Sequence, residues 1–315
     1  SITTALIGDT TMKRLLNALT AALAIGAAAA GQAHAADLDG TLKKISDTGV
    51  ITIGHRETSI PFSYYDANQK PVGYSIDICT RIVDAVKTRI KRDDIQVKYL
   101  PVTSATRIPL MGNGTIDLEC ASTSNTLDCQ KQVAFSVTTF VTGNRFISLK
   151  SANLKTIDDL KGKTVASTSG TANIRQANEI NEARSLGMKV VPVKEHAEGF
   201  LMVETGRAAA FIMDDILLYG LAANAKEPDR YQVSGDSLSI EPYAIMLRRD
   251  DPQFKALVDD TIKSLYASGD FEALYKRWYQ SPLPPKGINL NVAMSEVLKR
   301  VVATPTDSGD PVAYK

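Results

Sequence analysis

The sequence predicts an α/β protein of two lobes joined by two extended strands, and three observations support this. After about residue 42, short apolar strands alternate with amphipathic helices, which is typical of a largely parallel sheet covered by helices. This pattern restarts after about residue 150, and long extended segments at residues 140–150 and 241–249 follow the two units. The chain is also longer than one hydrophobic core usually fills.

The first 35 residues are expected to be a leader. Residues 12–14 (MKR) are basic, residues 15–31 are apolar and uncharged, and residues 33–35 (AHA) fit a signal-peptidase site. We therefore expect residues 1–35 to be an upstream segment and a cleaved signal peptide, and the exported chain to begin at Ala36. No other stretch has the uninterrupted apolar length of a transmembrane helix.

The elements of each unit follow from the periodicity of the apolar residues. In the first unit we expect strands at residues 50–53, 95–102 and 115–120 and helices at residues 75–90 and 104–111. In the second unit we expect strands ending near residue 168 and at residues 188–193 and 208–215, and helices from about residue 171 and at 197–206. The tail from residue 251 reads as helical. We therefore expect lobe 1 to comprise residues 36–142 and 244–315, and lobe 2 residues 143–243.

Polar residues follow the strand ends, where ligands of α/β proteins gather. In the first unit these are Arg56, Ser104 and Arg107, and the hydroxyl-rich segment "ASTSN" with Ser122 and Ser124. An arginine in the first turn of a helix opposes the helix dipole, and a bound anion would explain its position. The corresponding residues of the second unit are Thr171 in "STSGTA", His196 and Asp214.

Each of these residues also has an ordinary structural explanation. Arginines in loops are often solvated, serines at helix starts are often caps, and Asp214 could cap the following helix. His55 should point away from Arg56 because side chains alternate along a strand. The combination at the same end of both units nevertheless favours a binding site.

The charges of the predicted site indicate its ligand. Arg56 and Arg107 supply two positive charges, His196 a possible third, and Asp214 one negative charge. The complementary ligand carries two anionic groups and one cationic group. An acidic amino acid has this pattern.

The overall composition limits the other partners. The net charge is +1, which argues against nucleic acid or an acidic membrane surface. The three histidines are scattered, so neither a metal nor a cofactor is expected. Because export permits oxidation, we expect Cys120 and Cys129 to form a disulfide across "CASTSNTLDC" and Cys79 to be a buried free thiol.

A series of motifs resembles a known family: "GHRETSIPFSYYD", "TSATRIPLMGNGTIDLECASTSN", "TSGTA", "EHAEGF", "GRAAAFIMDD" and "MLRRDDPQFK". In this order they resemble the polar amino-acid branch of the bacterial extracellular solute-binding proteins, and within it the glutamate/aspartate-binding proteins of ABC uptake systems. The resemblance implies a two-lobe periplasmic-binding-protein fold of type II, with two hinge strands and the ligand in the interlobe cleft. It also implies a periplasmic monomer that delivers its ligand to ABC permease subunits.

The resemblance further implies a role for each predicted residue. Arg107, helped by Thr171, would hold the α-carboxylate, and Asp214 would hold the α-ammonium with Ser122 and Ser124. The side-chain carboxylate would be bound by Arg56, Ser104 and His196.

A ligand with an amide in place of this carboxylate would leave Arg56 buried without a charge partner. This should cost about 2–5 kcal/mol, or roughly a 30- to 3,000-fold preference for glutamate over glutamine. Glutamate and aspartate differ by one methylene, so dual specificity is expected.

Two other classes of function share this fold. An enzyme of the dehydratase or lyase kind needs a general acid or base in the crevice, for which His196 and Glu119 are the candidates. A sensory protein would present the same bound ligand to a receptor.

Overall fold

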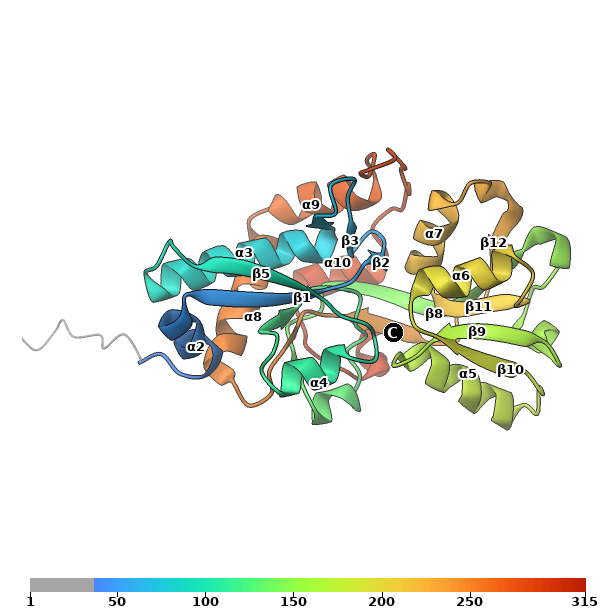
Figure 1. Ribbon diagram of the computed structural model, residues 1–315, viewed down its shortest axis with the longest axis horizontal. Helices are drawn as coiled ribbons and strands as arrows, with labels where there is room; N and C mark the ends of the chain where they lie inside the picture. The colour runs from blue at the N-terminus through green and yellow to red at the C-terminus, as the bar shows by residue number, and fades with distance from the viewer. Residues whose placement is uncertain (1–36) are drawn as a thin grey trace, which may run out of the picture. The chain divides into compact units, whose positions relative to one another are not determined.

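The computed structural model describes residues 37–315, of which Asp39–Lys315 form one compact unit. The predicted leader lies outside the described residues. Figure 1 shows β1 and β5 among helices α2, α3 and α8, and β9, β10 and β11 among helices α5, α6 and α7. The α/β class predicted from the alternating pattern is confirmed. No helix among the described residues is long and apolar enough to cross a membrane.

The first sheet has five strands in the order β5-β1-β6-β14-β7. Strand β1 pairs in parallel with β5 and β6, whereas β14 is antiparallel to β6 and β7. The strands are β1 (Val50–His55), β5 (Gln96–Pro101), β6 (Leu118–Glu119), β7 (Ala134–Phe135) and β14 (Met246–Leu247). Because β14 follows β13 in the chain, the chain returns to this sheet after completing the second one.

The second sheet has the order β10-β9-β11-β8-β12, and β13 also pairs with β8. Its strands are β8 (Phe140–Leu149), β9 (Thr164–Thr168), β10 (Lys189–Val193), β11 (Ala210–Asp214), β12 (Tyr231–Val233) and β13 (Ile240–Tyr243). The antiparallel pair β8 and β13 coincides with the two extended segments that the sequence indicates as hinges. The exact lobe boundaries at residues 142/143 and 243/244 stay a prediction.

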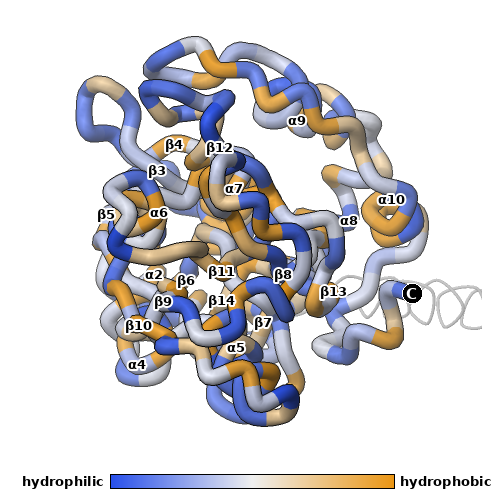
Figure 2. The backbone as a smooth tube through the Cα atoms, turned by 90° about the vertical axis from the view of Figure 1, so that its right-hand side faces the viewer, coloured by the Kyte–Doolittle hydropathy of each residue, from blue (hydrophilic) through white to orange (hydrophobic). Residues whose placement is uncertain are grey.

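Several helices are amphipathic and bury one apolar face. Helix α3 buries Ile78, Ile82 and Val86, and in Figure 2 hydrophobic and hydrophilic residues alternate along α10, which buries Leu298 and Val301. Helix α8 packs on α2 and α3, so the tail lies against the first sheet's helices. The helices are α2 (Gly40–Thr48), α3 (Tyr74–Ile90), α4 (Arg107–Gly112), α5 (Ala172–Ala183), α6 (His196–Glu204), α7 (Asp215–Asn224), α8 (Pro252–Ala267), α9 (Asp270–Tyr279) and α10 (Glu296–Ala303).

A small antiparallel sheet follows β1 and joins an aromatic cluster at the hinge. It consists of β2 (Thr58–Ser59), β3 (Ser63–Tyr65) and β4 (Pro71–Val72). Between β2 and β3, Phe62 contacts the rings of Tyr74, Phe140, Tyr243 and Tyr279. Since Phe140 begins β8 and Tyr243 ends β13, this cluster anchors both hinge strands to the helices of the first sheet.

The predicted disulfide between Cys120 and Cys129 is wrong. Cys120 is bonded to Cys79, with Cα atoms 6.3 Å apart, and Cys129 is a free, half-buried thiol. Cys79 lies on the buried face of α3, which brings it to Cys120 directly after β6. Cys129 instead packs against the apolar cluster around Met111 and Val133.

Removal of this disulfide should destabilise the protein. The bond closes a loop of 41 residues, and the loss of this constraint on the unfolded chain is worth about 4 kcal/mol. We expect Cys79→Ala to lower the free energy of unfolding in urea by this amount, and Cys129→Ala to lower it much less. Equal losses in the two variants would contradict the assignment.

Candidate functional site

Arg56 lies directly after β1, as the sequence predicts, and its guanidinium is fully buried. Its Nη1 donates a hydrogen bond of 2.6 Å to Ser104 Oγ, and its Nη2 donates one of 2.7 Å to Glu195 Oε2. Among the described residues, its Nε has no hydrogen-bond partner. Such a buried, unused donor is costly unless a ligand accepts from it.

Ser104 precedes helix α4, although the sequence predicted a helix from residue 104. Helix α4 begins at Arg107, and its N-cap residue is Thr106. The chain reaches this helix through a turn in which Thr103 and Thr106 bond to each other. The Ser104 hydroxyl is thereby free to accept from Arg56.

Arg107 is the second buried arginine. Its Nη1 donates to Thr123 Oγ1 at 2.5 Å and lies 3.7 Å from Glu119 Oε1, and Thr123 in turn donates to Glu119 Oε2 at 2.7 Å. Burial lowers the pKa of Arg107, which the charge of Glu119 partly offsets. Its Nε also lacks a hydrogen-bond partner within the part of the chain that the structure describes. Glu119 thus serves as the counter-ion of Arg107, which gives this carboxylate a role other than acid–base catalysis.

His196 begins α6 and is buried. Its Nδ1 lies 2.9 Å from Thr168 Oγ1. Burial, together with the positive charges of Arg56 and Arg107, holds the pKa of His196 well below its usual value. At neutral pH His196 is therefore an uncharged hydrogen-bonding group, and the third positive charge that the sequence allowed does not exist.

Asp214 ends β11 and is buried at the N-cap position of α7, but its side chain makes no capping bond. Its Oδ1 accepts from Asn173 Nδ2 at 2.8 Å, and its Oδ2 accepts from the Tyr243 hydroxyl. Burial and the nearby negative charge of Glu241 raise the pKa of Asp214 to about 7, although the two hydrogen bonds act to lower it. A carboxyl group with this pKa is stabilised in its charged form by any cation that binds beside it.

The three remaining predicted residues supply hydroxyl groups. Ser122 Oγ is buried and, among residues 37–315, has no hydrogen-bond partner. Ser124 is buried and its backbone pairs with Tyr243 in an isolated bridge. Thr171 caps α5, accepting from Ile174 N at 3.3 Å.

The structure brings the predicted residues into two adjoining groups. Arg56 with Ser104, Arg107 and His196 form the first, since the charges of both arginines act on the histidine. Asp214 belongs to the second, which Tyr243 joins to Ser124. At Gly170, with φ of +77°, an added Cβ would lie 2.6 Å from Ala105 Cα, so the turn before α5 packs closely on the segment that precedes Arg107.

Sequence reasoning missed several of the partners. Glu195 was detectable only as an acidic residue at the N-cap position before His196, and Tyr243 only as part of an extended segment. Asn173 was not predicted, because an uncharged side chain inside a predicted helix indicates no particular role. His55, assigned away from the site, is buried against the rings of Tyr65 and Tyr99.

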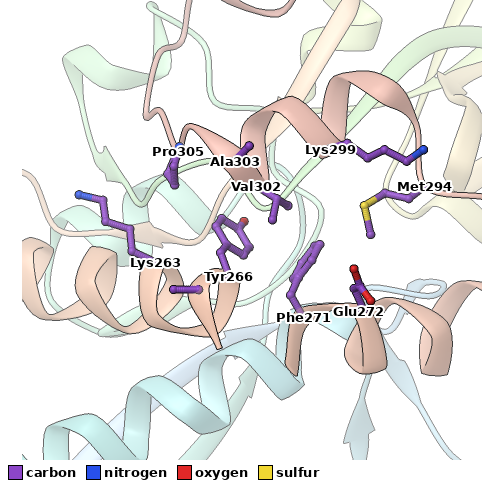
Figure 3. A pocket seen from close by; sticks show the side chains of 10 residues that line it. Lys263, Tyr266, Phe271, Glu272, Met294, Lys299, Val302, Ala303 and Pro305 are labelled. Atoms are coloured by element: carbon purple, nitrogen blue, oxygen red, sulfur yellow. The ribbon is translucent and has the colours of Figure 1, made fainter. Parts of the chain in front are cut away.

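A separate cavity of about 600 Å³ lies among α8, α9 and the segment around α10 (Figure 3). Its lining includes Tyr266, Phe271, Met294 and Val302. None of the predicted ligand-binding residues lines it. Within the described residues, no cluster of histidine, cysteine, aspartate or glutamate is arranged to hold a metal ion.

Comparisons with known proteins identify the family. The profile of the bacterial extracellular solute-binding proteins, family 3, matches residues 51–281. The chain is 48% identical to the L-glutamate/L-aspartate-binding protein of Pseudomonas aeruginosa, over 93% of this chain and 98% of that protein. It is 47% identical to the glutamate/aspartate import solute-binding protein of Escherichia coli, over 91% and 95% of the respective chains.

Among solved structures, a mutant of ArgBP from T. maritima superposes with a TM-score of 0.67 at 26% identity, covering 75% of this chain and 98% of that one. The predicted type II periplasmic-binding-protein fold is thereby confirmed. The chain belongs to the bacterial extracellular solute-binding proteins of family 3.

Proposed function

We propose that this protein is the solute-binding component of an ABC importer, which captures L-glutamate and L-aspartate in the periplasm and delivers them to the membrane permease. Relatives named for the binding or import of glutamate and aspartate cover more than nine-tenths of the chain. They give no support to the enzyme alternative. One observation carries the choice of ligand. Two buried arginines, whose Nε atoms have no hydrogen-bond partner among residues 37–315, adjoin a buried carboxyl group with a raised pKa.

The ligand would bridge the two groups of side chains. Arg107 and Thr171 would hold the α-carboxylate, since a charged fork and a helix N-terminus both favour an anion. Asp214 would take the α-ammonium, and the Ser122 hydroxyl, which lacks a partner among the described residues, would bond the ligand together with Ser124. Arg56 and Ser104 would bind the distal carboxylate, while neutral His196 would donate a hydrogen bond to it from its second ring nitrogen.

Calorimetric titration of the protein, dialysed free of carried-over ligand, tests this proposal. We expect one-to-one binding of L-glutamate and L-aspartate and weaker binding of L-glutamine. If neither acid gives a heat of binding while the protein still unfolds cooperatively, the ligand assignment is wrong, although the fold assignment stands.

A further inference from the structure

We propose that Glu195 is a specificity-determining residue, which sets how strongly the site prefers an acidic side chain over its amide; this inference rests on the proposed function. Glu195 is the N-cap residue of α6, and its side chain is 13% exposed. Its Oε2 lies 2.7 Å from Arg56 Nη2. The ion pair therefore joins the loop after β1, in the first sheet, to a helix of the second sheet.

Arg56 thus receives a negative partner from the protein itself. Because one Nη contacts Glu195 and the other contacts Ser104, the Nε–H and the second proton of each Nη are left for a ligand. A distal carboxylate bound there would share the guanidinium with Glu195. Two carboxylates beside one cation repel each other, and in a buried site this repulsion is poorly screened.

The neighbouring charges do not relieve this repulsion. Arg107 has its own counter-ion in Glu119, and His196 is uncharged at neutral pH. An amide ligand, in contrast, would not strand Arg56, because Glu195 stays as its charge partner. The discrimination between glutamate and glutamine should therefore be smaller than an isolated buried arginine would produce.

Replacing Glu195→Gln tests the role of the charge alone. The amide keeps an oxygen that can accept from Arg56 Nη2 but removes the negative charge. We expect L-glutamate to bind more tightly and L-glutamine more weakly. The ratio of the glutamine Kd to the glutamate Kd should rise roughly 10- to 100-fold, as for unit charges about 6–12 Å apart at an effective dielectric constant of about 20.

Two matched variants control for other effects. Glu198→Gln makes the same change in the first turn of the same helix, where Glu198 Oε2 accepts from Lys194 N rather than from Arg56. Glu195→Asp keeps the charge and shortens the side chain. The ratio of the two Kd values should stay within about threefold of the wild-type ratio in both variants, a range of less than 1 kcal/mol.

The outcomes separate this inference from the function on which it rests. If wild-type protein binds neither amino acid, the proposed function is wrong. If wild-type protein binds L-glutamate but Glu195→Gln leaves the ratio unchanged, the inference is overturned. An equal loss of affinity for both ligands would also overturn it, because Glu195 would then only hold the lobes together.

Discussion

Replacing Arg107 with methionine is expected to weaken L-glutamate binding by roughly 30- to 3,000-fold. The α-carboxylate would lose its charged fork, and Glu119 would be left buried without its arginine. An uncompensated buried charge also destabilises the fold, by about 3–5 kcal/mol. Titration calorimetry and urea unfolding measure the two losses separately.

A double variant distinguishes binding from stability. Adding Glu119→Gln to Arg107→Met removes the stranded charge, so most of the stability should return while the affinity stays low. Arg184→Met is the matched control, because this arginine is half exposed and bonds only weakly to Asp158 at 3.4 Å. Recovery of glutamate affinity in the double variant would show that Arg107 does not bind the ligand.

Glutamate affinity is expected to fall about tenfold for each pH unit below 7, because free Asp214 becomes protonated there and only its carboxylate pairs with the α-ammonium. Burial and the charges of Arg56 and Arg107 hold the pKa of His196 well below its usual value, so protonation of this histidine does not explain a fall that begins at pH 7. Binding at pH 6 should therefore release a proton, which calorimetry in buffers of different ionisation enthalpy detects. Asp214→Asn should bind weakly with a nearly flat pH profile, and a slope equal to that of wild type in this variant would exclude Asp214 as its cause.

Asp214 also affects the stability of the ligand-free protein. This stability should be higher at low pH, whereas the glutamate affinity should be higher at neutral pH. A raised pKa in the folded state means that Asp214 contributes stability that is fully present below pH 3.8 and lost as the pH rises through about 7. The contribution is at most about 4 kcal/mol over this range. The difference in unfolding free energy between wild type and Asp214→Asn, followed by urea denaturation, should change by this amount from pH 4 to pH 8.

The parts of the fold that repeat along the chain were predictable from the sequence. Strand β1 alternates β-branched residues, α3 repeats apolar residues with helical spacing, and polar residues stand at the strand ends. The positions of Arg56 and Asp214 follow from the last of these patterns, because each lies at the end of a strand. The small sheet β2-β3-β4 was missed, because strands of two or three residues are too short to show a period.

Partners that meet only through tertiary packing were not predictable. Cys120 had two candidate partners, and the choice depends on how α3 lies over β6. Glu195 reaches Arg56 only because helix α6 is brought against the loop after β1. Local sequence carries no information about such distances, so the summed charges of the site omitted both Glu195 and Glu119.

The place of β14 between β6 and β7 has a consequence for the loop closures that folding requires. All strands of the second sheet lie between Phe140 and Tyr243, which pair with each other at its hinge end. The first sheet cannot be completed until Met246 and Leu247 have been added, which requires closure of a loop that contains the whole second sheet. The chain of the second sheet is therefore an insertion within the sheet that carries Arg56, and both sheets share the same long loop closure.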